Sequence, residues 1–227
     1  MKSSFNLLTG RENNELVEHQ GFLIHKGTLD SFTKLQAQAK KDINADLQIV
    51  SSFRDYNRQE IIWNNKASGY RAVFDDQNIQ LHKDDFSELD YVKKIMRFSA
   101  LPGSSRHHWG TDLDIFDARN IEKKEVQLIH KECIDDGPCS ELHTWLDEQI
   151  NLQSSFGFFR PYENDLGGVS IEKWHLSHAP IAMDLFNDYT IDIFIENLHS
   201  GVIVSKEAII ENLQFFYENF VKNIKMP

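Results

Sequence analysis

Cysteine is scarce in this sequence. Its 227 residues include only two, Cys133 and Cys139, which flank a short segment containing a Gly-Pro pair. A disulfide across this segment and two free thiols in a reducing compartment both fit the spacing. The pair does not form a CxxC motif, and the sequence offers no second pair. The sequence therefore disfavours a zinc site built from cysteines.

Long hydrophobic runs are absent as well. The first twenty residues contain no apolar run of seven or more residues, so they do not predict a secretory signal. No segment elsewhere in the sequence approaches the length of a membrane span. From these two features we expect a protein that has no membrane span and stays in the cytoplasm.

Positive charge is in deficit. The chain has 24 lysines and arginines against 35 aspartates and glutamates, a formal net charge of -11. This balance argues against nucleic acid or an anionic membrane as the main partner. Apolar residues make up 41% of the chain and include 16 phenylalanines and four tryptophans, enough for a sizeable core. The length fits one good-sized domain, or one domain with an appendage.

Apolar spacing predicts helices that alternate with short strands. Phe32, Leu35 and Ala39 recur at helical intervals, whereas Leu113 and Ile115 alternate with polar residues as in a strand. The same reasoning predicts helices at 28–42, 56–69, 85–101, 140–157, 180–199 and 205–224, and strands at 47–53, 109–117 and 169–177. Because the strands are few and short, we expect an α+β fold with a small antiparallel sheet flanked by helices.

The stretch SSRHHWGTDLDIFD, residues 104–117, gathers two histidines and three aspartates around one glycine. If the chain turns at Gly110 and then runs extended, His107 can face Asp114, and both residue types are good zinc ligands. Chance pairs of this kind are common in a chain with ten histidines. The chemistry alone also leaves competing ligands in the same stretch, namely His108, Asp112 and Asp117.

A second stretch, EKWHLSH at 172–178, offers a third ligand. A catalytic zinc usually takes three protein ligands and leaves the fourth position to water, and His175 completes such a set. Glu172 lies three residues earlier, so an extended strand would place it on the opposite face from His175. A bulge or turn that brought Glu172 round would set a general base beside the metal.

Three blocks of this sequence together resemble a known family. They are S-x-x-R-x-x-x-x-Q (Ser51, Arg54, Gln59), S-x-H-x-x-G-x-x-x-D (Ser105, His107, Gly110, Asp114) and E-x-W-H (Glu172, Trp174, His175). In this order they resemble the VanY-type D-alanyl-D-alanine carboxypeptidases. That family belongs to a wider group of zinc peptidases that also includes the dipeptidase VanX and the hedgehog-like fold. The resemblance covers roughly residues 28–182.

The resemblance implies a role for each matched residue. It places Zn²⁺ on His107, Asp114 and His175, and so selects His107 over its neighbour as the ligand. It makes Glu172 the general base. It also implies that Arg54 binds the substrate, with Gln59 and Ser105 as neighbours in the substrate pocket. We expect Trp174 to contact the substrate as a wall of the cleft or to belong to the core, and not to take part in the chemistry.

Two positions depart from the family pattern. Asp112 stands where the family often has alanine, and Lys173 stands where it often has proline. Neither change removes a ligand or the base, but Asp112 adds negative charge near the metal. Arg71 and Arg106 are both candidates for a second positive partner of the reaction's oxyanion, and the sequence does not choose between them.

The resemblance also implies an architecture and a function. We expect a zinc peptidase domain of the hedgehog and D,D-peptidase type over residues 1–186, with a helical extension over 187–227 packed on it. The expected activity is zinc-dependent removal of the C-terminal D-alanine, at a D,D or L,D bond, from peptidoglycan peptides or muropeptides. A cell-wall endopeptidase of the same fold and a non-catalytic zinc-binding protein are the alternatives. Oligomeric state is not indicated.

Overall fold

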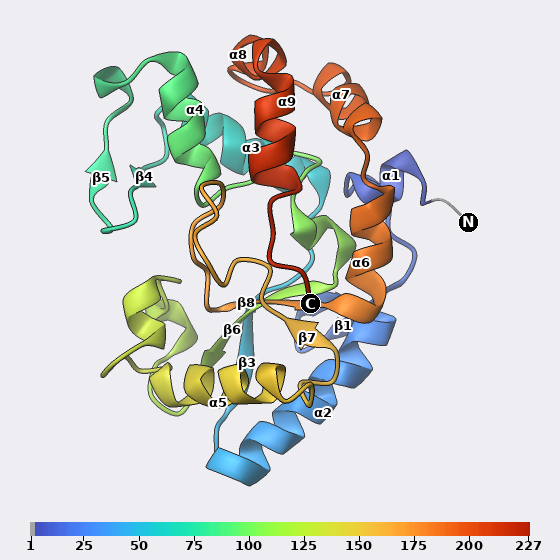
Figure 1. The fold of residues 1–227 in the computed structure, drawn as a ribbon, viewed down its shortest axis with the longest axis vertical. Coiled ribbons are helices and arrows are strands. Elements are labelled where there is room, and N and C mark those ends of the chain that lie inside the picture. The colour runs from blue at the N-terminus through green and yellow to red at the C-terminus, as the bar shows by residue number, and fades with distance from the viewer. Residues whose placement is uncertain (1–2) are drawn as a thin grey trace.

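The computed structural model describes residues 3–227 and has the α+β architecture expected from the sequence (Figure 1). Its helices are α1 Phe5–Leu8, α2 Lys26–Ile43, α3 Tyr56–Ala67, α4 Glu88–Met96, α5 Ser140–Asn151, α6 Ala179–Asp188, α7 Ile191–Ser200, α8 Lys206–Glu211 and α9 Leu213–Phe216. Its strands are β1 Leu16–His19, β2 Phe22–His25, β3 Leu47–Ser51, β4 Val73–Phe74, β5 Gln80–Leu81, β6 Asp112–Asp117, β7 Phe158–Phe159 and β8 His175–His178.

The central sheet has the order β3-β6-β8-β7, with every neighbouring pair antiparallel. Side chains alternate across a strand, so Leu113 and Ile115 of β6 point to one face and Asp112 and Asp114 to the other. All six residues of β6 are buried, because both faces of this strand are covered. The sequence pattern of β6 therefore separates an apolar face from a polar face inside the protein.

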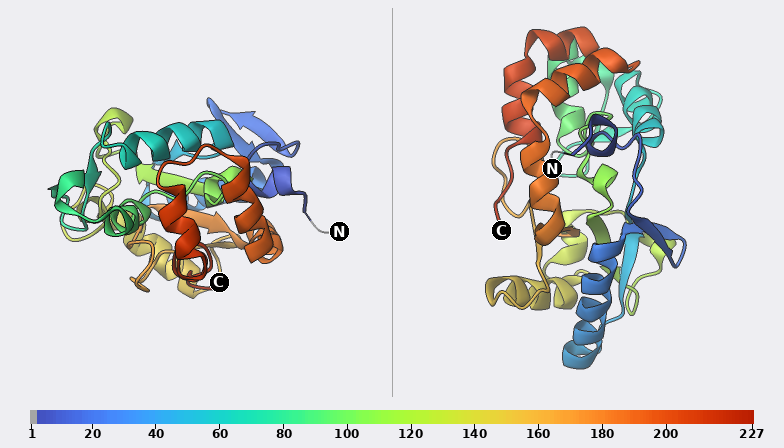
Figure 2. Two further views of the ribbon diagram at one scale, coloured as in Figure 1. Left: turned by 90° about the horizontal axis from the view of Figure 1, so that it is seen from above. Right: turned by 90° about the vertical axis from the view of Figure 1, so that its right-hand side faces the viewer.

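The apolar face of the sheet packs against α2 and α5. Phe32 and Leu35 of α2 and Leu142 of α5 join Leu113 and Leu176 in one buried cluster. Figure 2 shows these two helices together at one end of the molecule, away from α7 to α9. The two helices cover the apolar face of the sheet. The polar face, which carries Asp112 and Asp114, therefore points away from them.

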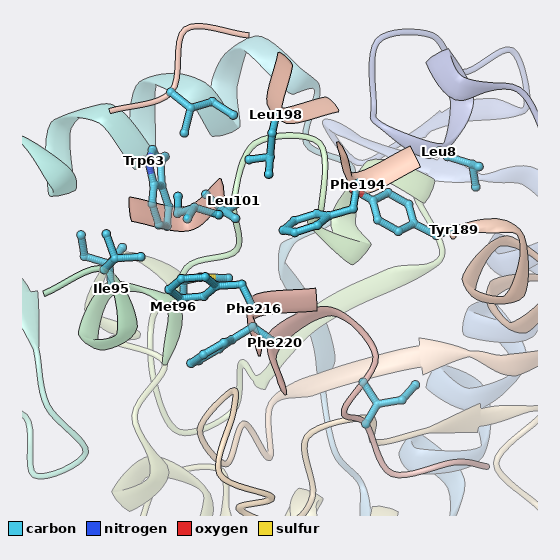
Figure 3. Close-up of a cluster of buried hydrophobic side chains, with 14 of the residues drawn as sticks. Leu8, Trp63, Ile95, Met96, Leu101, Tyr189, Phe194, Leu198, Phe216 and Phe220 are labelled. Carbon is cyan, nitrogen blue, oxygen red and sulfur yellow. The ribbon is translucent and has the colours of Figure 1, made fainter. Parts of the chain in front are cut away.

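A second core lies among α3, α4 and the helices of the chain's last fifty residues (Figure 3). Trp63 of α3 and Leu101 are fully buried in it together with Phe194 and Leu198 of α7 and Phe216 of α9. The region 187–227 thus supplies side chains to the same core as the first hundred residues. The boundary predicted at 186 stays a prediction.

Several sequence-based boundaries were wrong. The helix expected at 85–101 is α4, which begins only after Ser87, whose side chain caps the Asp90 N–H. The tail segments are interrupted, the first between α6 and α7 and the second between α8 and α9. The hairpins β1-β2 and β4-β5 were not predicted. Both cysteines are buried free thiols, so the disulfide alternative is not the one that the structure shows.

No helix in residues 3–227 is long and apolar enough to cross a membrane.

Leu198→Ala tests whether the tail belongs to the main core. Leu198 is fully buried, so we expect its truncation to lower the free energy of unfolding by about 2–5 kcal/mol. Denaturant unfolding should show one cooperative transition that shifts as a whole. Val202→Ala is the control, because Val202 is 78% exposed and its loss should change the unfolding free energy by less than about 0.5 kcal/mol. A separate minor transition that alone responds to Leu198→Ala would make the tail an independent unit.

Candidate metal centre and active site

Two neighbouring strands bring the three predicted ligands together. Asp114 of β6 pairs directly with His175 of β8, and His107 lies in the short helical turn Arg106–Trp109 that precedes β6. Gly110 ends that turn in the left-handed conformation, at φ 68°, and the chain then enters the strand. The turn at Gly110 expected from the sequence is therefore present, and it brings His107 back over Asp114.

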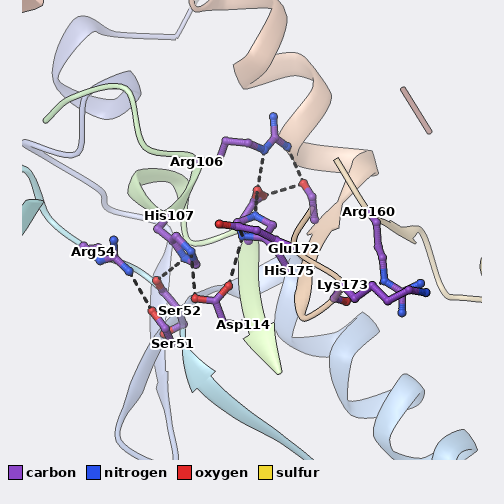
Figure 4. Close-up of polar contacts among 12 residues, drawn as sticks. Ser51, Ser52, Arg54, Arg106, His107, Asp114, Arg160, Glu172, Lys173 and His175 are labelled. Carbon is purple, nitrogen blue, oxygen red and sulfur yellow. Dashed lines mark hydrogen bonds and ion pairs between the residues drawn. The ribbon is translucent and has the colours of Figure 1, made fainter. Parts of the chain in front are cut away.

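The donor atoms of these three side chains converge on one point (Figure 4). His107 Nε2 lies 3.3 Å from Asp114 Oδ2, and His175 Nδ1 lies 3.2 Å from Asp114 Oδ1. One ligand atom from each residue falls within 4.8 Å of the other two, and all three residues are buried. Asp114 Oδ1 is buried and has no hydrogen-bond partner among the described residues. Two imidazoles and one such carboxylate are a donor set that suits a metal ion.

Hydrogen bonds behind the ligands orient both imidazoles. His107 Nδ1 lies 2.9 Å from the carbonyl oxygen of Ser52, to which it donates, so Nε2 is left to face Asp114. His175 Nε2 lies 3.1 Å from Asp112 Oδ2, so its N–H donates there and Nδ1 faces the centre. Outer partners of this kind fix the tautomer of metal-binding histidines. Both rings therefore direct their second nitrogen at the same point.

The Asp114 carboxylate stays ionised. Burial acts to raise the pKa of Asp114, but the neighbouring His107 and His175 outweigh it and hold the pKa well below its usual range. A carboxylate that remains charged in a buried position is ready to bind a cation without first losing a proton.

Asp112 lies behind the candidate metal centre, where it holds the His175 ring. Its Oδ2 accepts a hydrogen bond from Arg106 Nε at 2.7 Å, and its Oδ1 accepts one from Ser177 Oγ at 2.7 Å. Arg106 Nη2 also donates to Ser177 Oγ, at 2.6 Å. Burial acts to raise the pKa of Asp112, but the charge of Arg106 together with His175 and the Ser177 hydrogen bond outweighs it and keeps the pKa low. The added negative charge expected from Asp112 is thus paired with the charge of Arg106.

Glu172 reaches His175 through a turn. Strand β8 begins only at His175, so the strand expected over 169–177 was wrong for its first six residues. The His175 N–H donates to the carbonyl oxygen of Glu172 at 3.1 Å, which closes the turn. Glu172 Oε2 then lies 3.5 Å from His175 Nδ1, and the side chain is 12% exposed. The turn that the sequence required in order to bring these two residues together is present.

Arg54 lies between β3 and α3 and is held from two sides. Arg54 Nη1 donates to Gln59 Oε1 at 2.8 Å, and Nη2 contacts Ser51 Oγ at 3.3 Å. Its neighbour Asp55 does not pair with it but caps α3, accepting a hydrogen bond from the Arg58 N–H. Arg54 is therefore a positioned guanidinium and not a helix cap.

A cavity of about 620 Å³ opens over the metal centre. Of the residues expected in the site, it is lined by Arg54, Ser105, His107, Asp114, Glu172, Trp174 and His175. Gln59 is the exception, because it is fully buried behind Arg54 and does not line the cavity. The prediction that Gln59 neighbours the substrate needs this correction: its amide positions Arg54.

The sequence analysis missed several residues of the cavity. Tyr162 packs its ring edge-on against His175, with centroids 5.0 Å apart, and Lys66 lines the wall formed by α3. Tyr162 carried no usable signal, since it lies in an irregular segment far from every motif. The sequence did contain a signal for Lys66. It follows Gln59 by seven residues, so the two side chains lie on the same face of α3.

Comparisons with known proteins agree with this architecture. The VanY family, described as D-alanyl-D-alanine carboxypeptidase, matches residues 21–181. An uncharacterized protein of Haemophilus influenzae is 34% identical over 106 residues, which cover 44% of this chain and 72% of that protein. The structure of VanYB in complex with D-Alanine-D-Alanine has a TM-score of 0.53 and 22% identity, covering 79% of this chain and 84% of that chain. The structure of the LD-carboxypeptidase LdcB has a TM-score of 0.53 and 22% identity, covering 82% and 79%.

The two solved structures show a shared fold, and the family match shows more. It spans well over half of the chain and contains all three sequence blocks, from Ser51 to His175. The resemblance expected over residues 28–182 is therefore confirmed. The chain belongs to the VanY family of D-alanyl-D-alanine carboxypeptidases, a family of peptidases.

Proposed function

We propose that this protein is a zinc-dependent carboxypeptidase that removes the C-terminal D-alanine of peptidoglycan peptides. The observation that carries the proposal is the meeting, in one cavity, of a three-residue metal centre, a carboxylate beside it and a positioned guanidinium. The fold is shared with VanYB, which was solved with D-Alanine-D-Alanine, and with the LD-carboxypeptidase LdcB. Both D,D and L,D bonds are therefore within the proposed substrate class.

The proposed zinc ligands are His107 Nε2, an oxygen of Asp114 and His175 Nδ1. Two nitrogens and one oxygen with an open fourth position are typical of catalytic zinc. Zinc in this position supplies a Lewis acid for the scissile carbonyl and lowers the pKa of a bound water. A VanY relative was solved in complex with Zn(II), which supports the choice of metal.

Glu172 is the proposed general base. Its carboxylate lies next to His175 Nδ1, the atom that faces the metal centre, so it borders the position from which a water attacks. Glu172 accepts the proton of that water and then delivers it to the amine of the leaving residue. The turn closed by the His175 N–H holds the carboxylate at this place.

Arg54 is the proposed anchor for the free C-terminus of the substrate. A guanidinium binds a carboxylate through two parallel hydrogen bonds. The Gln59 side chain holds the guanidinium of Arg54 in place at the cavity wall. Ser105 and Trp174 line the same cavity and are proposed as substrate contacts. Arg71 and Arg106 both line it and both remain candidates for the oxyanion, although Arg106 Nε is bonded to Asp112.

The test is product analysis on matched peptides with free and amidated C-termini. We expect the purified protein to contain one zinc per chain and to release D-alanine from free-acid tetra- or pentapeptides only. Arg54→Ala should raise KM for the free acid by about tenfold or more, because a charge-assisted hydrogen bond contributes about 1.5–3 kcal/mol. Arg58→Ala is the matched control, since Arg58 follows in the same segment and does not line the cavity. Equal cleavage of both peptide forms would indicate an endopeptidase instead.

A further inference from the structure

The cationic side chains that line the cavity include Arg54, Lys66 and Arg71. Within residues 3–227 none of them forms an ion pair with a carboxylate, although other arginines do, such as Arg97 with Asp165 and Arg106 with Asp112. Lys66 Nζ donates only to Ser99 Oγ, at 2.6 Å. Arg54 and Lys66 are half-buried and Arg71 is exposed, and a half-buried charge without a counter-charge favours an anionic ligand.

Lys66 lies close to the two guanidinium groups. Burial, together with the charges of Arg71 and Arg54, lowers the pKa of Lys66 to about 8. Arg54 precedes α3, whereas Lys66 lies in the last turn of that helix. Lys66 therefore lies further along α3 than Arg54.

Gln59, buried behind the cavity wall, links Arg54 to the segment that holds Lys66. The Gln59 amide bonds to Arg54 Nη1 on one side and to the Ala100 carbonyl oxygen, at 2.6 Å, on the other. Ala100 follows Ser99, the partner of Lys66. Gln59 and Lys66 are also two helical turns apart on α3, about 10 Å along its axis. A single carboxylate held by both Nη atoms of Arg54 thus leaves Lys66 without an anionic partner.

We propose that Lys66, with Arg71 beside it, forms a second carboxylate subsite that receives an acidic side chain on the leaving C-terminal residue. The proposal rests on the proposed carboxypeptidase function, because that function places the α-carboxylate of the leaving residue on Arg54. A residue of glutamate type carries its second carboxylate at the end of a short flexible chain, which can extend along the cavity toward Lys66. The preferred leaving residue is then a dicarboxylic amino acid.

The activity test uses three peptides that differ only in the last residue: D-glutamate, its neutral isostere D-glutamine, and D-alanine. We expect the wild-type protein to favour D-glutamate over D-glutamine by about tenfold in kcat/KM, as one charge-assisted contact allows. Lys66→Met should abolish this ratio, and Lys66→Arg should retain most of it. A wild-type ratio at or below one overturns the proposal without recourse to any variant.

Two controls separate a binding role of Lys66 from a structural one. Ser99→Ala removes the hydrogen-bond partner of Lys66 but keeps its charge, and Lys94→Met removes another lysine that lines the same cavity. Both variants should keep the preference for D-glutamate. If Ser99→Ala loses the preference as fully as Lys66→Met, Lys66 acts through the 99–101 segment and the proposal is wrong.

A binding measurement distinguishes this proposal from the proposed function. Calorimetric titration of the zinc-loaded protein with free D-glutamate and free D-glutamine requires no turnover. We expect about tenfold tighter binding of D-glutamate, lost in Lys66→Met. If that holds while no peptide is cleaved, the subsite stands and the carboxypeptidase function fails. If peptides are cleaved but the two amino acids bind equally, the function stands and the subsite fails.

Discussion

Replacing Glu172 with glutamine is expected to lower kcat on free-acid peptides by about 10²–10⁴-fold while the protein keeps its zinc. The amide has the shape of the carboxylate but cannot accept the proton of the attacking water, and general-base catalysis contributes a factor of this size. The turn to His175 should survive, because it depends on the backbone carbonyl of Glu172. Zinc content by elemental analysis and steady-state kinetics on one peptide provide the two readings.

The two readings separate three roles for Glu172. Loss of turnover with zinc retained identifies the base, whereas loss of zinc would make Glu172 a ligand. Normal turnover would mean that the base lies elsewhere in the cavity. Glu163→Gln is the matched control, because Glu163 precedes the same irregular segment and pairs with Lys225 outside the cavity. It should change kcat by less than about twofold.

The sequence could predict the candidate metal centre because the proposed ligands lie in short motifs whose geometry is local. His107 and Asp114 are joined by one glycine turn and one strand, and Glu172 and His175 by a single turn. What the sequence could not show is why the competing ligands are unsuited. His108 bonds to the Arg54 carbonyl oxygen and to the Gly103 N–H, and burial lowers its pKa to about 3.

The alternation of side chains along β6 explains where the two competing aspartates, Asp112 and Asp117, point. Asp117 points to the opposite face of β6 from Asp114 and is bound by Arg119. Asp112 shares the face of Asp114, so its proximity to the centre was visible in the sequence. Its partners Arg106 and Ser177 were not, because the pairing of Asp112 with Ser177 depends on the register between β6 and β8. The packing of residues 187–227 on the main core also depends on contacts between segments that are distant in the sequence, so it could not be predicted either.

Asp112→Ala is expected to weaken zinc binding and to destabilise the protein for two separable reasons. His175 Nε2 loses its carboxylate partner, and changes to such partners typically cost 10–100-fold in metal affinity. Arg106 is left buried and unpaired, with its side chain 4% exposed, which should lower the free energy of unfolding by about 3–5 kcal/mol. Competition with a chelator measures the first effect, and denaturant unfolding of the metal-free protein measures the second.

Combining Asp112→Ala with Arg106→Met tests whether the two effects are separate. The methionine removes the uncompensated charge and keeps an apolar side chain among the rings of Trp109 and Phe186, which now lie 5.0 and 5.6 Å from the guanidinium carbon. We expect the double variant to regain most of the lost unfolding free energy, because an apolar replacement of a buried ion pair is often neutral. Its zinc affinity should stay low, since His175 Nε2 still has no carboxylate to hold the ring. If zinc affinity returned together with stability, the orientation of His175 would not depend on Asp112, and the weaker binding of the single variant would reflect a loosened fold.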